Sequence, residues 1–162
     1  VKATFEMAKV KTGALMVIER STPLNEIERT GIEIDGLISS QLLINIFEHN
    51  TPLHDGAVVL SGNKVIAATC YLPLSDNMDI SKDLGTRHRA AVGISEVSDS
   101  LTVVVSEETG RVSVAENGSL SHIKDSDELK KVLSRLTEQK ETGGKRFKIW
   151  KGRIRNERKV AK

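Results

Sequence analysis

Short apolar runs separated by turn-forming residues predict two β-hairpins. Residues 57–60 and 65–71 are both β-prone, and the link between them contains Gly62-Asn63, a pair that suits the positive φ angles of a tight turn. Residues 101–105 and 112–115 form a second pair of such runs, on either side of a polar loop. Each pair is expected to form two adjacent antiparallel strands.

The rest of the chain predicts one further strand and four helices. Residues 14–18 are continuously apolar, which indicates a buried strand. Ser39 and Thr86 are expected to cap the helices that follow them, because their hydroxyls can accept hydrogen bonds from free backbone N–H groups. The helical spacing of apolar residues places the four helices at residues 2–11, 41–49, 87–96 and 125–139.

This alternation predicts an α/β fold in which helices flank a mixed central β-sheet. The 162 residues leave room for about one domain. Apolar residues make up 38% of the chain, which is enough for a globular core and excludes intrinsic disorder over most of the length. Gly143-Gly144 follow the last predicted helix and mark a break. We therefore expect a folded domain over residues 1–142 and a separate tail over residues 143–162.

Charge divides the chain at the same place. Residues 143–162 contain nine Lys or Arg and one acid, a net charge of +8, whereas the other 142 residues contain 15 basic and 21 acidic residues, a net charge of −6. Phe147, Trp150 and Ile154 recur at helical spacing among the basic residues of the tail, a pattern that would suit an anionic surface. The alternative, which we favour, is a disordered basic tail.

Cysteine content and hydropathy exclude other classes of protein. The single Cys70 cannot form an internal disulfide or a zinc-binding cysteine cluster, so a reducing compartment fits best. Any metal would have to bind to His, carboxylate, hydroxyl or phosphate oxygen. No apolar run approaches the roughly 20 residues that span a bilayer, so these residues predict no transmembrane helix.

The first candidate for chemistry is His54-Asp55-Gly56-Ala57, at the start of a predicted strand. Asp-Gly before a strand is commonly turn chemistry. His54 beside Asp55 offers a second interpretation, because imidazole and carboxylate together can bind a divalent cation or move a proton. Gly56 would then let a ligand approach the backbone closely.

The second candidate is Gly85-Thr86-Arg87-His88-Arg89, in the first turn of a predicted helix. Positive side chains are unfavourable at this end of the helix dipole, so an anion should compensate them. Free N–H groups, the Thr86 hydroxyl and two guanidinium groups would together bind phosphate oxygens. The alternative is a surface turn in which Arg87 and Arg89 pair with acids of the domain.

A third segment, Ser106-Glu107-Glu108-Thr109-Gly110, is the loop of the second predicted hairpin. A hairpin loop needs no further function. If this loop lies beside the other two segments, one of its acids could hold a cation against phosphate groups, because hard cations prefer oxygen ligands.

The frames Thr51-Pro-Leu-His-Asp-Gly-Ala57 and Leu84-Gly-Thr-Arg-His-Arg-Ala-Ala91 resemble the paired DGA and RHR motifs of diadenylate cyclase (DAC) domains. The run Gly13 to Glu19 and the loop Ser106 to Gly110 match as well, so the resemblance covers roughly residues 5–139. It implies the DAC (DisA N-terminal-like) fold and is strongest to the membrane-tethered bacterial class. Val1 would then begin a soluble fragment, preceded in the full protein by membrane helices at the cytoplasmic face of the cell membrane.

The resemblance implies an enzyme that condenses two ATP molecules into cyclic di-AMP and two pyrophosphates. The divalent cofactor would be Mn²⁺, Mg²⁺ or Co²⁺. Two nucleotides must face each other head to tail, so a homodimer or higher oligomer is expected. Regulatory protein partners are compatible with this class, and no nucleic-acid partner is expected. The alternative is a nucleotide sensor without turnover.

The resemblance also assigns roles to individual residues. Asp55 would orient and deprotonate the attacking 3′-hydroxyl, while Gly56 and Ala57 would shape the backbone around the ribose. The expected triphosphate-binding residues are Gly85, Thr86, Arg87, His88, Arg89, Ser106 and Glu108. His54 and Glu108 would bind the metal, and Leu15, Tyr71 and Leu72 would form walls of the adenine pocket, although Tyr71 and Leu72 would equally suit a strand-end core.

Overall fold

The computed structural model describes residues 1–77 and 84–136. Contacts within the chain divide it into two units, Val1–Ser126 and Asp127–Lys162. The first unit holds the sheet and its helices, which are α1 (Lys2–Lys9), β1 (Ala14–Ile18), α2 (Asn25–Glu28), β2 (Ile32–Leu37), α3 (Ser40–Phe47), β3 (Ala57–Ser61), β4 (Lys64–Cys70), α4 (Thr86–Val97), β5 (Leu101–Val105), β6 (Val112–Glu116) and β7 (Ser119–Ile123).

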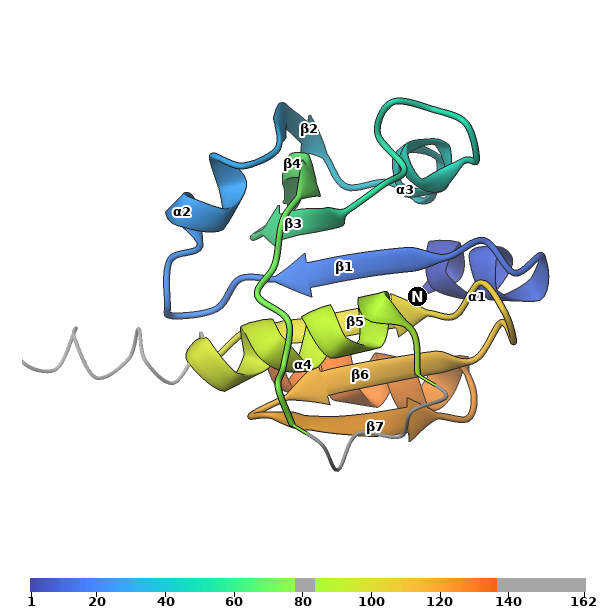
Figure 1. Ribbon diagram of the computed structural model, residues 1–162. Coiled ribbons are helices and arrows are strands. Elements are labelled where there is room, and N and C mark those ends of the chain that lie inside the picture. Colours follow the sequence, from blue (N-terminus) through green and yellow to red (C-terminus); the bar gives the residue numbers. More distant parts are fainter. Residues whose placement is uncertain (78–83, 137–162) are drawn as a thin grey trace, which may run out of the picture. The chain divides into compact units, whose positions relative to one another are not determined.

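Seven strands form one mixed sheet in the order β2-β4-β3-β1-β5-β6-β7 (Figure 1). The strands β1 and β3 run parallel, with Met16 opposite Val58. The pairs β1–β5, β2–β4, β3–β4, β5–β6 and β6–β7 are antiparallel. The mixed sheet expected from the sequence is therefore confirmed.

Both predicted hairpins are present. Gly62, in the turn between β3 and β4, has a φ of +59°. The sheet also contains two strands that the sequence pattern did not reveal, β2 and β7. The turn before β7 is Asn117-Gly118, whose φ angles of +51° and +73° are those of a two-residue hairpin turn with the right-handed twist of its strands.

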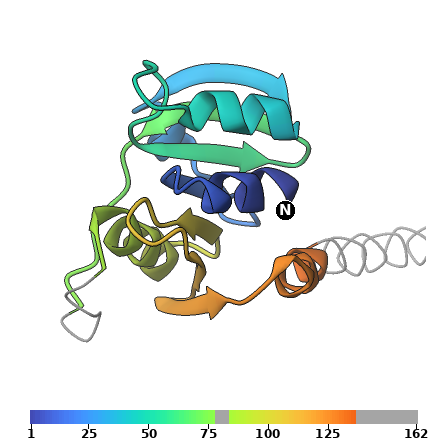
Figure 2. The ribbon, with the colours of Figure 1, turned by 90° about the vertical axis from the view of Figure 1, so that its right-hand side faces the viewer.

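The central strands are buried on both faces because helices cover both. All five residues of β5 are buried. On one face, Leu15 and Val104 share a core with Ala91 and Ile94 of α4. α1 contacts β5 and β6 as well, and it also packs against α3 (Figure 2). α4 therefore covers the face of β5 that carries Val104, and α1 packs against β5 and β6 as well.

The helix starts show one correct and one wrong capping prediction. The Ser39 hydroxyl accepts a hydrogen bond from the backbone N–H of Leu42 at 3.0 Å, so it caps α3 as expected. Thr86, in contrast, is the first residue of α4, and the capping position is Gly85, which forms no side-chain bond. The Thr86 hydroxyl therefore remains available for another partner.

The predicted helix at residues 125–139 is helical from 126 to 136, and its remaining residues lie outside the described part of the chain. The expected domain boundary at residue 142 and the basic tail over residues 143–162 lie outside it too. Among residues 1–77 and 84–136, no helix has the length and hydropathy needed to span a bilayer.

Candidate active site

One edge of the sheet gathers the three candidate segments. β1 and β3 are parallel neighbours, so Gly13 and Gly56, which precede them, lie at the same edge. β5 is antiparallel to β1 and places Val105, its last residue, opposite Ala14. The loop after Val105 therefore opens at this edge as well. Neighbouring strands are about 5 Å apart, so the 54–56 and 106–111 loops are separated by about two strand spacings.

The first turn of α4 reaches the same edge. Arg87 Nη1 lies 2.8 Å from Glu107 Oε2 in the loop after β5. A Cβ atom added to Gly13 would be 3.1 Å from both Arg87 Cζ and Glu107 Cβ. Arg87 thus lies against the start of β1, the strand next to the one that begins after Asp55. The two motifs are not on opposite sides of the fold.

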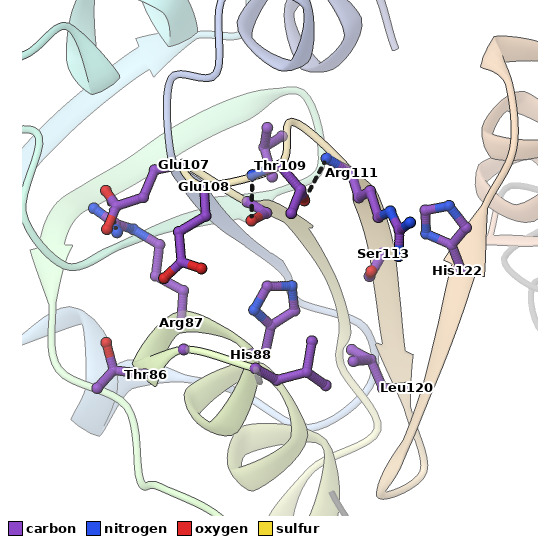
Figure 3. Close-up of a pocket in the computed structure, with 14 residues that line it drawn as sticks. Thr86, Arg87, His88, Glu107, Glu108, Thr109, Arg111, Ser113, Leu120 and His122 are labelled. Atoms are coloured by element: carbon purple, nitrogen blue, oxygen red, sulfur yellow. Dashed lines mark hydrogen bonds and ion pairs between the residues drawn. The ribbon is translucent and has the colours of Figure 1, made fainter. Parts of the chain in front are cut away.

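A cavity of about 550 Å³ opens beside this first turn (Figure 3). It is bounded by the start of α4, the loop between β5 and β6, and the strands β6 and β7. Six residues expected to bind the triphosphate line it, and they are Gly85, Thr86, Arg87, His88, Ser106 and Glu108. Six further lining residues were not predicted as site residues, and they are Leu84, Val105, Arg111, Ser113, Leu120 and His122.

The signal that would have found three of the missed residues is the turn before β7. Ser113 lies opposite His122 in the β6–β7 register, and Leu120 lies opposite Ala115. Without β7, Leu120 and His122 have no place in the fold. The Asn117-Gly118 pair was visible in the sequence as a hairpin turn.

The other expected site residues do not line this cavity. Leu15 is buried in the core, Leu72 is half-buried against that core, and Tyr71 is 75% exposed. The adenine pocket that these three residues would form stays a prediction. Arg89 also lies off the cavity, and its backbone carbonyl accepts a hydrogen bond from Ser75 N at 3.0 Å.

Gly56 approaches the protein's own backbone, whereas we expected its missing side chain to admit a ligand. Its φ is +101°, and an added Cβ would lie 2.8 Å from the carbonyl carbon of Thr69 and 3.1 Å from the carbonyl oxygen of Cys70. The β3–β4 register is irregular here, and Thr69 itself has a φ of +57°. Gly56 is therefore needed to close β3 onto an irregular part of β4. Ala57 is fully buried, so its side chain belongs to the core.

Asp55 is exposed, and no hydrogen bond or ion pair of its side chain is found within residues 1–77 and 84–136. Nothing in the described protein neutralises this carboxylate or fixes its direction. It stands outside the cavity but at the same edge of the sheet. Such a group can accept a proton from a substrate brought to that edge.

The charges at the start of α4 are unequally compensated. Arg87 pairs with Glu107, as the surface-turn alternative required, but Glu107 itself lines the cavity. His88 is 6% exposed. Burial lowers the pKa of His88 from its ordinary value; Glu108 opposes this shift and Arg87 adds to it. Burial thus favours an uncharged ring that can both donate and accept a hydrogen bond.

The two expected metal ligands do not form a complete site. In the described ranges, no group of three or more His, Cys, Asp or Glu residues could hold a metal ion. His54 Nδ1 lies 2.6 Å from the carbonyl oxygen of Thr51 and would donate to it, which leaves Nε2 with its lone pair free. His54 and Glu108 could therefore each supply one ligand, provided that phosphate oxygens supplied others.

Comparison with known proteins identifies the family. The family model for the DisA bacterial checkpoint controller nucleotide-binding domain (DAC) matches residues 1–120. The chain is 53% identical over 154 residues to the cyclic di-AMP synthase CdaA of Bacillus subtilis, covering 94% of this chain and 56% of that protein. It is 52% identical to a diadenylate cyclase of Listeria monocytogenes, covering 93% of this chain and 56% of that protein. The chain thus spans just over half the length of these relatives.

Solved structures agree. The crystal structure of a double mutant of DacA from Staphylococcus aureus has a TM-score of 0.82 and 52% identity, covering 83% of this chain and 90% of that one. A hypothetical membrane spanning protein from Bacillus cereus has a TM-score of 0.74 and 44% identity, covering 76% and 61%. These similarities confirm the resemblance seen in the two motifs and the expected fold. The chain belongs to the DAC family of nucleotide-binding domains.

Proposed function

We propose that this chain is the catalytic part of a diadenylate cyclase, which condenses two ATP molecules into cyclic di-AMP and two pyrophosphates. The observation that carries the proposal is the shared edge, where an exposed carboxylate lies near a cavity of about 550 Å³ at a helix N-terminus. The relatives from B. subtilis and L. monocytogenes bear names for this activity and match more than 90% of the chain.

The cavity suits the triphosphate of one ATP. Gly85 and Thr86 line it at the positive end of α4, where backbone N–H groups lack helical partners and phosphate is favoured. The Thr86 hydroxyl is not used as a cap and can donate to a phosphate oxygen. Arg87 can exchange its half-exposed partner Glu107 for phosphate, because the guanidinium group binds both anions in the same forked geometry.

Asp55 is the group that we assign to proton transfer. In each half-reaction a 3′-oxygen bonds to the α-phosphorus of the other ATP, and the bond from that phosphorus to the pyrophosphate oxygen breaks. The 3′-hydroxyl proton passes to the Asp55 carboxylate, and the electron pair of the broken bond leaves with pyrophosphate. Arg87 and the start of α4 stabilise the negative charge that develops on this leaving group.

A divalent cation fits this arrangement only together with the substrate. His54 and Glu108 would hold it along with ATP phosphate oxygens, since the described residues contain no larger cluster of ligands. When bound, the cation would offset phosphate charge and lower the pKa of the attacking hydroxyl.

A second copy of the chain completes the reaction. Asp55 lies outside the cavity and faces solvent, so it can serve a nucleotide that spans two molecules. A cavity of about 550 Å³ is in the range that holds one small ligand. Two copies that meet at this sheet edge would hold two ATP molecules in the orientation that solution does not supply.

The full protein is proposed to work at the cytoplasmic face of the cell membrane. One similar solved structure is described as a membrane spanning protein, and the chain covers 61% of it. The membrane anchor would lie in the part of the protein that this chain does not span. Fractionation of cells that express the full-length protein would test this, since recovery in the soluble fraction would contradict it.

The experiment that tests the activity is incubation of the chain with ATP and Mn²⁺ or Mg²⁺, followed by chromatography of the products. The parent should form cyclic di-AMP with a rate that rises with protein concentration. Asp55→Asn keeps the shape of the side chain but removes the base, so ATP should bind normally while product formation falls by about 10²-fold or more. Unchanged turnover would refute the role of Asp55. ATP binding without any turnover by the parent would instead support a nucleotide sensor.

A further inference from the structure

The part of the cavity over β6 and β7 contains polar residues that the proposed reaction does not use. Ser113 and His122 are register partners on adjacent strands, so their side chains project from the same face of the sheet. Arg111 precedes Ser113 by two residues and projects from that face as well. Ser113 is also the register partner of Val104, which packs in the core with α4. Figure 3 shows the three side chains on the side of the cavity away from Glu107, with His88 between.

Two of the polar side chains in this region lack a protein partner. Ser113 and His88 are each 6% exposed, and both line the cavity. Neither side chain forms a hydrogen bond or an ion pair with any residue in the described part of the chain. Buried polar groups in folded proteins are nearly always hydrogen-bonded. Because both side chains line the cavity, a molecule that binds there can supply their hydrogen bonds.

The charge around this space indicates what the occupant is. Arg111 carries a permanent positive charge and has no ion pair within residues 1–77 and 84–136. Arg87, at the other end of the cavity, already has Glu107 as a partner. His122, His88 and Ser113 add hydrogen-bond donors to the side of Arg111. An anion with several acceptor oxygens satisfies all of these groups, and a phosphate chain is such an anion.

We propose that this part of the cavity is a pyrophosphate subsite, which binds the β- and γ-phosphates of ATP and then the pyrophosphate that leaves. The proposal rests on the proposed function for the identity of the substrate. It adds Arg111, Ser113 and His122, which neither family motif contains, to His88 of the RHR motif. The residues of the subsite are His88, Arg111, Ser113 and His122.

Isothermal titration calorimetry with inorganic pyrophosphate, without nucleotide, tests the subsite on the whole chain. Arg111→Ala should raise the dissociation constant about tenfold or more, because it removes a charge-assisted contact. Ser113→Ala should raise it several-fold. The matched control is Arg29→Ala, which removes an exposed arginine paired with Glu26 on α2, outside the cavity, and should leave the constant unchanged.

A structural role for Ser113 predicts a different result. Because its hydroxyl has no partner in the described protein, Ser113→Ala should leave the unfolding temperature unchanged or raise it while pyrophosphate binding weakens. A lower unfolding temperature with unchanged binding would show that the hydroxyl acts in folding and would overturn its assignment. Titration with adenosine provides a further control, since Arg111→Ala should not alter it.

The subsite and the proposed function can fail separately. Pyrophosphate binding that depends on Arg111 supports the subsite even if no cyclic di-AMP is formed. Parent-like pyrophosphate binding by both Arg111→Ala and Ser113→Ala overturns the subsite, even if the parent makes cyclic di-AMP at a normal rate.

Discussion

Replacing Gly56 by alanine should strongly destabilise the fold. Gly56 has a φ of +101°, a conformation that residues with a Cβ atom rarely adopt. The added methyl group would lie 2.8 Å from the Thr69 carbonyl carbon and 2.9 Å from its Cα. Carbon atoms normally pack about 3.5–4.0 Å apart. Both contacts are with backbone, so no side chain can rotate away to relieve them.

Gly62→Ala provides a matched control for the backbone cost alone. Gly62 has a φ of +59°, and an added Cβ at this position meets nothing within 4 Å. The left-handed conformation should cost about 1–2 kcal/mol in each variant. The overlap with β4 should add about 1–3 kcal/mol for Gly56→Ala. We therefore expect Gly56→Ala to lose about 2–5 kcal/mol in total, and the difference between the variants to be at least about 1 kcal/mol.

Urea unfolding followed by far-ultraviolet circular dichroism measures both free energies. The midpoint for Gly56→Ala should fall well below that for Gly62→Ala, with similar slopes because both variants expose the same surface on unfolding. Equal losses in the two variants would refute the argument, because they would show that the contact with Thr69 and Cys70 costs nothing.

Three further predictions concern the site and the core. Arg87→Ala should weaken ATP binding about tenfold or more by calorimetry, and unchanged binding would return this segment to a surface turn. Burial lowers the pKa of His88, so below about pH 6.5 the unfolded chain binds more protons than the folded chain. The folded state should therefore lose stability as the pH is lowered through this range. His88→Gln should reduce this loss, as thermal unfolding curves at several pH values would show. Burial raises the pKa of the Cys70 thiol to about 11, and the charge of Glu28 adds to this shift. Iodoacetamide should therefore label Cys70 at pH 8 much more slowly in the native chain than in the urea-unfolded chain, as mass spectrometry would show.

The parts of the fold that the sequence revealed are those with strong local patterns. The apolar run that became β1 and the Gly62 turn both appear where they were expected. β2 was missed although Ile32-Glu33-Ile34-Asp35 alternates apolar and polar residues, which is the pattern of a half-buried strand. The alternation covers only four residues before Gly36, so it is a short signal.

The site was predictable as far as its motifs extend along the chain. Thr86, Arg87 and His88 are consecutive residues, and local chemistry was enough to place them at a helix start. Ser113 and His122 are nine residues apart and meet only through the pairing of β6 with β7, which the Asn117-Gly118 turn indicated but which was not predicted. The role of Gly56 could not be inferred either, because it depends on the irregular backbone of β4.

The central parallel pair has a consequence for how the chain folds. Met16 of β1 lies beside Val58 of β3, which is 42 residues later in the chain (58 − 16), and α2, β2 and α3 lie between them. Closing so long a loop costs conformational entropy before its contacts form, so this pairing is slow compared with local hairpins. Asp55 is not brought to the same edge as the cavity until that step is complete. During refolding, turnover of ATP should therefore return after most secondary structure has formed, and it would mark the moment at which the chain becomes native.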